Sequence, residues 1–545
     1  MTSTFRPDEW YTFGCGTSGP RSATAEVVGN KAANLICMAE AGLPVPPGFV
    51  LPTGLCRAYY EAGQHLPEPA IEALHRGIRE MERATGLMFG SDRSPLLVAV
   101  RSGAPVSMPG MLDTLLNVGL CERTLPALIR LTGNPRHAWD SYRRLIQTFA
   151  EVVHGLSPDP FTHLLAEALR REDVPTVTEL DVAALKCLVR GFLDHYEAEK
   201  GASFPQDPLV QLFEAAEGVF RSWRSPRAVE YRRLHSLDDR VGTAVTVQTM
   251  VFGNMGGTSG AGVGFTRNPA TGKKELYLDF LRNAQGEDVV SGRCAVSGAV
   301  DLEQSMPELH RQLQQMGHRL EMLFRDVQDF EFTVQEGRFY LLQSRDAKRT
   351  AGAALRIACE QVAEGQLEER TALERLAAYD LASIRTVRLA ASDGCRPIGQ
   401  GTPASPGVAV GEAVFEPERA VALAAAGRCP ILVRADISTA DIGGIAASVG
   451  CLTTRGGRTS HAAVIARQLD KVCIVGCREL TFEGAGQGCS IGSHAFGEGT
   501  WVSLDGNAGN VYTGKLEVVV ETPTPYLQEV DQWKARLGSP IRQNS

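Results

Sequence analysis

Apolar and polar residues follow two different spacings along the chain, which predict helices in some segments and strands in others. In residues 29–48, GNKAANLICMAEAGLPVPPG, apolar side chains recur at helical spacing and stop at Gly42 and the prolines that follow, so a helix ending near Gly42 is expected. From about residue 118 to residue 240 the spacing is again mostly helical, as in HAWDSYRRLIQTFAEVVHGL. This part of the chain is predicted to be a helical subdomain.

Strand spacing follows this helical part. The run TAVTVQTMVFG, residues 243–253, is rich in β-branched side chains and leads into the glycine-rich residues 253–264, so a strand followed by a loop is expected. In residues 329–345, DFEFTVQEGRFYLLQSR, apolar and polar side chains alternate before Glu336-Gly337 and a second β-rich run follows. This pattern predicts a β-hairpin that turns at Glu336-Gly337.

The chain is expected to contain several domains. Its 545 residues exceed the roughly 100 to 200 residues of one domain, and its 43% hydrophobic and 22% charged residues are typical of a globular protein. An Ala-rich helical segment follows Arg349, and short strands with glycine turns begin after Arg396-Pro397. A linker is therefore expected between these two points.

Charge and cysteine content narrow the expected partners. The net charge of −8 comes without a run of Lys and Arg, so nucleic acid is not an expected partner. The N-terminus lacks the apolar core of a signal peptide, and no stretch approaches the roughly 18 apolar residues of a membrane span, so a cytoplasmic protein without a membrane partner is expected. The thirteen cysteines are scattered without a CxxC pair, which favours buried thiols over zinc sites or disulfides.

The glycine-rich stretch is a candidate phosphate-binding loop. Glycine lets successive backbone N–H groups surround an anion without side-chain clashes, although such a stretch can also serve only sharp chain reversals. It matches neither a Walker A nor a Rossmann motif. The candidate residues are Gly253, Gly256, Gly257, Thr258 and Gly260.

The predicted hairpin carries polar residues two positions apart. Asp329 and Glu331 would share one face of the first strand, and Gln343 and Arg345 one face of the second. Two carboxylates can hold Mg²⁺ against the phosphates of a nucleotide, and a guanidinium group can bind a phosphate oxygen pair. The alternative is a solvated face with ordinary salt bridges.

Two further basic residues lie where anions are commonly bound. Arg101 follows the strand-like run LLVAV, so it would lie at a strand end, and Lys31 would lie at the beginning of the first helix. Strand ends and helix N-termini suit anion binding, although each residue taken alone is more often a surface charge.

A histidine near the C-terminal end has the most specific surroundings. In residues 453–469, TTRGGRTSHAAVIARQL, a double-glycine turn and Thr459-Ser460 precede His461 at the beginning of an apolar helix. The first-turn N–H groups and the helix dipole disfavour a protonated imidazole and favour a bound phosphate, which covalent phosphoryl transfer requires. A capped helix with an incidental histidine is the alternative.

Taken together, these segments resemble those of the pyruvate phosphate dikinase family, which includes phosphoenolpyruvate synthase. The similar segments run nearly from end to end: WYTFG, NKAANL, GLPVPPGF, VRSGAPVSMPGMLDT, TGNPRHAWDSYRR, VQTMVFGNMG, FTRNPATG, NAQGEDVV, QDFEFT, LLQSRDAKRT and GGRTSHAAVIAR. The opening WYTFG and the AWDSYRR block are more similar to the dikinase than to the synthase.

The resemblance implies a multidomain fold of α/β and α+β class. Residues 1–350 would form an ATP-grasp nucleotide-binding region with a helical insertion at about 118–240, and residues 351–394 a helical linker or hinge. Residues 395–520 would form a swivelling phosphohistidine β/α domain, and residues 521–545 a C-terminal tail.

The resemblance also implies the site residues and the chemistry. ATP would be bound beneath the glycine loop by Lys31, Arg101, Glu287, Asp329, Glu331, Gln343 and Arg345, with Asp329 and Glu331 as Mg²⁺ ligands. The catalytic residues would be His461, Arg101, Arg345, Arg458, Thr459 and Ser460. His461 would take a pyrophosphoryl group from ATP with release of AMP, and inorganic phosphate, or else water, would then accept the outer phosphoryl group, leaving phosphohistidine.

The sequence departs from the family pattern in several places. Family members continue into a (β/α)₈ barrel that binds pyruvate or phosphoenolpyruvate, whereas this sequence stops at KARLGSPIRQNS, so the final phosphoryl acceptor is expected to be a small molecule or a separate protein. Arg458 replaces the usual Met of GGMTSH, Gly257 replaces a common acidic residue, and Asn30 with Ala32 vary the GGKGAN form. Arg458 could contact the phosphoryl group on His461 or the acceptor, or lie exposed to solvent.

Two alternatives to an active phosphohistidine enzyme stay open. One is a non-catalytic nucleotide-binding or regulatory relative, against which the retention of both the nucleotide residues and His461 argues. The other is a fragment of a full dikinase.

Overall fold

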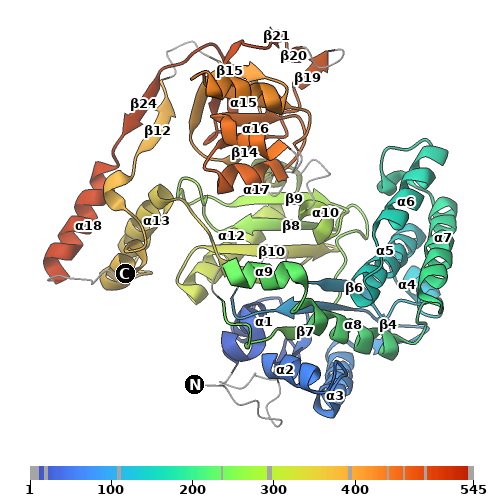
Figure 1. Cartoon of the computed structure of the whole chain (residues 1–545). Helices are drawn as coiled ribbons and strands as arrows, with labels where there is room; N and C mark the ends of the chain where they lie inside the picture. The colour runs from blue at the N-terminus through green and yellow to red at the C-terminus, as the bar shows by residue number, and fades with distance from the viewer. Residues whose placement is uncertain are drawn as a thin grey trace. The chain divides into compact units, whose positions relative to one another are not determined.

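The computed structural model describes residues 11–16, 23–106, 108, 112–234, 237–290, 298–390, 396–437, 441–457, 461–483 and 488–537. It divides into two compact units, each built from two segments of the chain. Unit 1 consists of residues 1–259 and 333–345, and unit 2 of residues 260–332 and 346–545. Figure 1 shows their helices and strands in colours that run along the chain. None of the helices in these described ranges combines the length and apolar character needed to cross a lipid bilayer.

Unit 1 contains a five-stranded sheet in the order β1-β2-β7-β5-β6. Its strands are β1 (Tyr11–Phe13), β2 (Gly48–Leu51), β7 (Ala244–Thr249), β5 (Val98–Gly103) and β6 (Thr114–Val118). A separate short pair, β3 (Met88–Phe89) and β4 (Pro95–Leu96), lies between β2 and β5 in the chain. Neighbouring strands of the five-stranded sheet are antiparallel. Every residue of β7 is buried, because this strand is the central one. The strand predicted from the β-branched run is confirmed.

Helices make up most of the rest of unit 1. They are α1 (Ala25–Glu40), α2 (Thr53–Glu61), α3 (Glu68–Thr85), α4 (Leu125–Thr132), α5 (Pro135–His154), α6 (Asp159–Arg171), η1 (Val177–Glu179), α7 (Val182–Lys200), α8 (Pro208–Ser222) and α9 (Pro226–Leu234). The helical spacing expected between residues 118 and 240 is confirmed, and Figure 1 shows α5 and α7 packed side by side. The ends of α5 follow from local chemistry, since the Asn134 side chain accepts a hydrogen bond from the His137 N–H and Gly155 ends the helix with a φ of 67°.

A four-stranded sheet in the order β11-β10-β8-β9 follows. Its elements and the neighbouring helices are β8 (Gly260–Phe265), β9 (Tyr277–Arg282), α10 (Gly286–Val290), α11 (Ala299–Ser305), α12 (Pro307–Phe324), β10 (Gln328–Gln335) and β11 (Arg338–Asp346). The predicted hairpin is confirmed: Glu336 and Gly337 have φ values of 49° and 79°, as a tight two-residue turn requires. The division between the units falls within β10 and β11, after Phe332 and after Arg345.

The glycines of β8 are explained by packing within unit 2. A Cβ at Gly260 would lie 2.2 Å from the Phe280 ring, and a Cβ at Gly262 would lie 2.4 Å from the Phe332 ring. The two phenylalanine rings are stacked on each other. Only glycine leaves room for rings so close to the strand backbone, so this half of the glycine-rich stretch has a structural reason that the sequence alone did not reveal.

The segments that flank the C-terminal domain form a small helical body. It contains α13 (Ala351–Ala363), α14 (Glu369–Leu376), η2 (Leu381–Ser383) and the C-terminal helix α18 (Thr524–Leu537). α13, α14 and α18 share a core that includes the buried Trp533, and strand β12 (Thr386–Leu389) pairs antiparallel with β24 (Val518–Glu521). The residues expected to be a linker and a tail are therefore packed against each other.

The remaining part of unit 2 contains an eight-stranded sheet in the order β13-β23-β22-β15-β16-β17-β18-β14. Its strands are β13 (Gly399–Gln400), β14 (Thr402–Ser405), β15 (Val408–Val414), β16 (Pro430–Arg434), β17 (Gly450–Thr453), β18 (Val472–Val475), β22 (Trp501–Asp505) and β23 (Asn510–Thr513). β15 to β18 are parallel and are connected through α15 (Pro417–Ala425), α16 (Ile442–Ala447) and α17 (His461–Gln468). A separate three-stranded sheet joins β19 (Leu480–Glu483), β20 (Gly488–Ile491) and β21 (His494–Gly497).

Alternate residues of the parallel strands belong to different cores. Leu432 of β16 packs with Ala420, Ile445 and Ala463 of the three connecting helices, whereas Ile431 packs in the core of the opposite face. This two-sided burial is the reason that the parallel strands are apolar throughout. It also fixes α17 on the sheet, and with it the place where the helix begins.

Candidate functional site

Lys31 lies in α1, just after a break in the helix. Gly29 has φ 77° and ψ 151°, and a Cβ on it would lie only 2.2 Å from the carbonyl oxygen of Gly103. The N–H of Asn30 donates to the carbonyl oxygen of Ala104 at 3.0 Å. The half-buried Lys31 is therefore fixed next to the end of β5, the strand that carries Arg101.

The end of β11 lies next to α1 and β5 in unit 1. The Arg101 guanidinium Nη1 donates to the carbonyl oxygen of Leu342 at 3.3 Å, and the Asn34 side chain donates to that of Ser344 at 2.7 Å. Both carbonyl groups flank Gln343, which is half-buried.

Side-chain direction on β11 follows from its burial pattern. Ser344 is buried while Gln343 and Arg345 are half-buried, so the last two share a face that differs from that of Ser344. The hydrogen bonds described above join α1 and β5 to β11. Lys31, Arg101, Gln343 and Arg345 therefore lie on three adjoining elements of unit 1. The other predicted residues are placed separately.

The first half of the glycine-rich stretch is a loop tied down at both ends. The Phe252 N–H donates to the Gln335 side chain at 2.8 Å, and the carbonyl oxygen of Thr258 accepts from the Gly337 N–H at 3.0 Å. Between these ties Gly256 has a φ of 125°, and a Cβ at Gly256 or Gly257 would meet nothing within 4 Å. Gly253 is buried, whereas Gly257 and Thr258 are exposed. The anchored ends and open middle suit a loop that closes over an anion.

A buried histidine supports this loop, and the site residues predicted from the sequence do not include it. The ring of His137, on α5, lies 4.7 Å from that of Phe252, and burial lowers its pKa to about 4. Nearby on α5, Arg143 and Arg144 hold the pKa of the Asp140 carboxyl well below its usual range, although burial opposes them. In the sequence, His137 is only a histidine on the apolar face of a helix that begins after Asn134. Such a position by itself indicates a residue of the hydrophobic core.

Unit 2 presents the two predicted metal ligands on one face of β10. Asp329 and Glu331 are half-buried and alternate with Phe330 and Phe332, which are fully buried. Two hard oxygen donors suit Mg²⁺, which commonly binds one or two carboxylates together with substrate phosphates. In the part of the chain that the structure describes, no cluster of three or more His, Cys, Asp or Glu residues offers a complete metal site. Glu287 lies in α10, and its side chain is outside the described residues.

α17 begins at His461, as predicted, and follows β17 in the parallel sheet. Arg458, Thr459, Ser460 and the His461 side chain lie outside the described residues. Ala462, Ala463, Ile465 and Ala466 are buried in the core beneath the helices, so one whole face of α17 is packed. The N-terminus of the helix is consequently held at the end of the parallel sheet.

Within unit 2, the last turn of α17 lies close to the carboxylates of the smaller sheet. Arg467 donates to the carbonyl oxygen of Ala404 at 2.9 Å. Desolvation lowers the pKa of Arg467, and the negative charges of Asp279 and Asp329 act in the opposite direction. The Tyr277 hydroxyl also donates to the carbonyl oxygen of Pro403 at 2.5 Å. The helix that begins at His461 thus has electrostatic contact with a predicted metal ligand.

Comparison with known protein families identifies two regions of the chain. Residues 64–298 match the AMP/ATP-binding domain of pyruvate phosphate dikinase, and residues 428–509 match the mobile domain of PEP-utilising enzymes. The first range includes Arg101 and the glycine loop, and the second includes His461. The chain is thus of the class that combines a nucleotide-binding domain with a mobile domain.

Individual proteins named pyruvate, phosphate dikinase are also similar to the chain. The chain is 42% identical over 526 residues to pyruvate, phosphate dikinase of Clostridium symbiosum, covering 96% of this chain and 60% of that protein. It is 41% identical over 535 residues to the enzyme of Rhizobium meliloti (96% and 60%), and 44% identical over 538 residues to pyruvate, phosphate dikinase 1, chloroplastic, of Oryza sativa subsp. japonica (97% and 57%). These similarities agree with the resemblance to the pyruvate phosphate dikinase family that the motifs indicate. The chain spans about three fifths of the length of these curated relatives.

Proposed function

We propose that this chain is an ATP-dependent phosphotransferase that phosphorylates its own His461 and releases AMP. The observation that carries the proposal is the position of His461 at the first residue of α17, on a helix packed into a parallel sheet. The helix N-terminus stabilises negative charge on a phosphoryl group and disfavours protonation of the imidazole. The family matches of both regions support the same function.

The basic residues and the glycine loop bind the nucleotide phosphates in this proposal. Lys31 at the beginning of the unbroken part of α1 and Arg101 within β5, two residues before the strand ends, supply positive charge. Arg345 adds a guanidinium group suited to paired phosphate oxygens. The N–H groups of the loop that contains Gly256 and Gly257 approach the phosphates from above. Gln343 and Glu287 contribute polar contacts to the nucleotide.

The proposed reaction has two phosphoryl-transfer steps. In the first, a ring nitrogen of His461 forms a bond to the β-phosphorus of ATP, the bond from that phosphorus to the oxygen bridging to the α-phosphate breaks, and AMP leaves. In the second, an oxygen of inorganic phosphate attacks the outer phosphorus, pyrophosphate leaves, and phosphohistidine remains. Preorganised positive charge lowers the barrier of both steps because negative charge moves onto the leaving oxygen.

Asp329 and Glu331 would hold Mg²⁺, because both are half-buried hard donors on one strand face. When bound, the ion supplies charge neutralisation of the phosphate oxygens. The family similarity supports ATP and Mg²⁺ as general requirements.

The phosphoryl group on His461 is then passed to an acceptor. We place that acceptor among small molecules or separate proteins. In the relatives the named reaction partners are pyruvate and phosphate. Arg458, three residues before the nucleophile, is proposed to contact the phosphoryl group or an anionic acceptor, and Thr459 and Ser460 to cap α17.

The test follows label from ATP into the protein. With Mg²⁺ and ATP labelled at the β-phosphate, acid-labile label is expected on His461 together with AMP in solution. His461→Ala should abolish labelling, whereas His494→Ala, which alters an exposed histidine of the same unit, should label like the wild type. Acid-stable label, label on His461→Ala, or ATP consumption without AMP would overturn the proposal, and the last result would favour a nucleotide-binding relative without this activity.

A further inference from the structure

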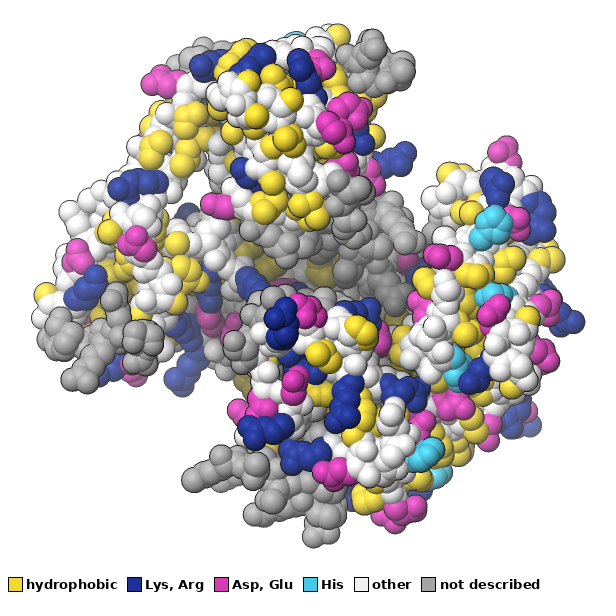
Figure 2. All heavy atoms as spheres, viewed as in Figure 1, with side chains coloured by type: hydrophobic (Ala, Val, Ile, Leu, Met, Phe, Trp, Pro, Cys, Tyr) yellow, Lys and Arg dark blue, Asp and Glu magenta, His cyan; other side chains and the backbone are white. Residues whose placement is uncertain are grey.

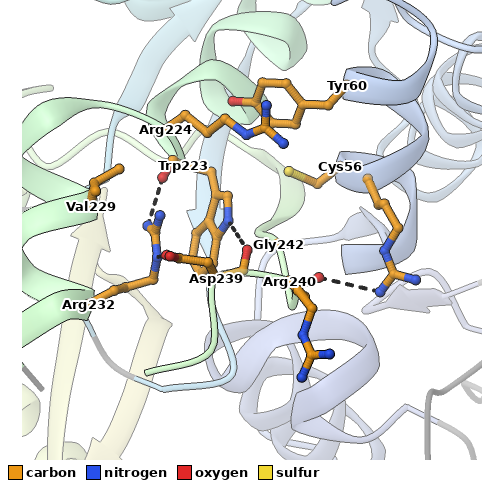
Figure 3. A pocket seen from close by; sticks show the side chains of 10 residues that line it. Cys56, Tyr60, Trp223, Arg224, Val229, Arg232, Asp239, Arg240 and Gly242 are labelled. Atoms are coloured by element: carbon orange, nitrogen blue, oxygen red, sulfur yellow. Dashed lines mark hydrogen bonds and ion pairs between the residues drawn. The ribbon is translucent and has the colours of Figure 1, made fainter. Parts of the chain in front are cut away.

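A cavity of unit 1 lies away from the residues assigned to the nucleotide. Its volume is about 520 Å³, within the range of small-molecule sites. It is formed by α2, the end of α8, α9 and the turn that precedes β7 (Figure 3). Among the residues that the structure describes, Lys31, Arg101, Gln343 and Arg345 are not part of its wall.

The wall combines flat apolar surfaces with arginines. Figure 3 shows Tyr60, Trp223 and Cys56 facing the same space. The Tyr60 hydroxyl donates to the carbonyl oxygen of Phe220 at 2.9 Å, and the Trp223 indole donates to that of Asp239 at 3.1 Å. Both rings are therefore fixed before any ligand arrives, which reduces the entropy cost of binding.

Two of the four arginines in the wall are neutralised by carboxylates. Arg232, almost completely buried, donates to Asp239 at 2.6 Å, and Arg240 forms an ion pair with Asp238 at 2.9 Å. Arg232 also lies over the Trp223 ring at 4.0 Å.

The other two arginines are less fully neutralised, although Arg57 also acts on the Asp238 carboxylate that Arg240 binds. The Arg224 guanidinium lies 3.8 Å from the centre of the Tyr60 ring, and Arg57 donates to the carbonyl oxygen of Arg240 at 3.3 Å. In the described ranges neither has an ion pair with an acidic side chain. Both side chains are exposed, so their donors are accessible to a ligand in the cavity.

These observations identify the chemistry of a ligand. Two guanidinium groups without an ion pair in the described ranges suit the charge of about −1.5 to −2 on a phosphate monoester at neutral pH, and their forked donors match its oxygens. The half-buried Tyr60 ring offers an apolar surface to a planar or apolar body of the ligand, whereas Trp223 is only 4% exposed. The Cys56 thiol does not suggest covalent chemistry, because burial raises its pKa to about 11.

We propose that this cavity binds a small phosphate monoester with a planar ring, whose phosphate group is held by Arg57 and Arg224 while its ring packs beside the half-buried Tyr60. Such a site is separate from the nucleotide residues and from His461. It gives the chain a second small-molecule ligand besides its substrates.

The test uses phenyl phosphate as the probe and calorimetric titration of the full chain as the measurement. Wild type is expected to bind, and Arg57→Gln/Arg224→Gln to bind at least about a hundredfold more weakly, about tenfold for each arginine. Arg79→Gln, an exposed arginine of α3 outside the cavity wall, is the matched control and should bind like the wild type. Because both cavity arginines are exposed, the thermal midpoint of the double variant without probe should equal that of the control.

Further arms separate this site from the nucleotide site. Arg101→Gln should leave phenyl phosphate binding unchanged, and inorganic phosphate should bind wild type at least about tenfold more weakly because it has no ring to pack beside Tyr60. Absence of binding to wild type, equal binding by the double variant, or loss of binding only in Arg101→Gln would overturn the proposal. Equal affinity for inorganic phosphate and phenyl phosphate would overturn the assigned ligand class.

Discussion

The backbone of Gly29 packs directly on that of Gly103: a Cβ at Gly29 would lie 2.2 Å from the Gly103 carbonyl oxygen. This contact joins the helix that carries Lys31 to the strand that carries Arg101. Because Gly29 also has a φ of 77°, any other residue would meet both backbone strain and a clash.

Gly29→Ala is therefore expected to lower the free energy of unfolding by more than the roughly 1 to 3 kcal/mol of backbone strain alone, and to weaken ATP binding. Gly63→Ala is the control, since Gly63 has a φ of 73° but nothing within 4 Å of its Cβ position. Urea unfolding and ATP titration measure the two effects. Equal destabilisation by the two substitutions would show that the contact with Gly103 is unimportant.

Asp329→Asn and Glu331→Gln should each slow labelling of His461. The loss is expected to correspond to about 2.7 to 4 kcal/mol of transition-state stabilisation, if each resembles removal of one preorganised electrostatic contact. The fold should persist, because both side chains are half-buried on a polar strand face. Glu308→Gln, on the exposed side of α12, serves as the control. Labelling at the wild-type rate in either β10 variant would remove that carboxylate from the metal site.

Arg267→Met should destabilise unit 2 strongly. The Arg267 side chain is fully buried and forms ion pairs with Glu321, Glu360 and Glu364, each at 3.0 Å. Removing it leaves the buried Glu321 carboxylate without this partner, which costs about 3 to 5 kcal/mol, whereas Glu360 keeps Arg356 and Glu364 keeps Lys274.

The control for this substitution is Arg311→Met. Arg311 forms an ion pair with Glu308 in which both side chains are exposed, so the pair should contribute at most about 1 kcal/mol to the free energy of unfolding. Thermal and urea unfolding of both variants measure the difference. Similar midpoints would mean that the three carboxylates find other partners or bind protons.

His137 should make unit 1 less stable in mild acid. Its pKa is about 4 in the folded chain, against an ordinary value of 6.5, so only the unfolded chain takes up a proton as the pH falls from about 6.5 to about 4. The free energy of unfolding should therefore fall over this interval, by up to about 3 kcal/mol. Above about pH 6.5 the residue contributes no pH dependence.

The measurement is the urea midpoint at about pH 7 and about pH 5. His137→Gln should show a smaller shift between the two than the wild type, with the rest due to His154, whose pKa burial also lowers to about 4. His65→Gln, at an exposed site, should shift like the wild type. An unchanged shift in His137→Gln would contradict the prediction.

Arg458→Met is expected to leave self-phosphorylation within a few-fold of wild type and to slow dephosphorylation by the acceptor, because the guanidinium is proposed to bind an anionic group of that acceptor. Single-turnover labelling and chase experiments measure both steps. Unchanged transfer to an identified acceptor would show that Arg458 takes no part in the transfer step.

Local signals in the sequence predicted the elements whose conformation depends on neighbouring residues. The turn at Glu336-Gly337 needs two positive φ values, and the helix at His461 follows a glycine turn, so both could be placed from residue types alone. The two halves of the glycine-rich stretch could not be distinguished in this way. Gly260 is needed by the Phe280 ring, which is distant in sequence, whereas Gly256 lies in an open loop.

The other features that could not be predicted also depend on packing between residues that are far apart in the sequence. Nothing in the tail indicates that Trp533 shares a core with α13 and α14. The sequence around His137 does not indicate its contact with the Phe252 ring, which depends on the fold. Arg57 and Arg224 are far apart in sequence, and only the fold makes them walls of one cavity.

The discontinuity of unit 1 has a consequence for the order of events during synthesis. Asn34 and Arg101 make their hydrogen bonds to Ser344 and Leu342, which leave the ribosome only after residues 260–332 have been made. Unit 1 thus remains without part of its own structure while the first segment of unit 2 emerges. A fragment that stops at residue 259 would lack these contacts permanently, so a separately produced nucleotide-binding unit needs residues 333–345 supplied, either in a second peptide or through a redesigned connection.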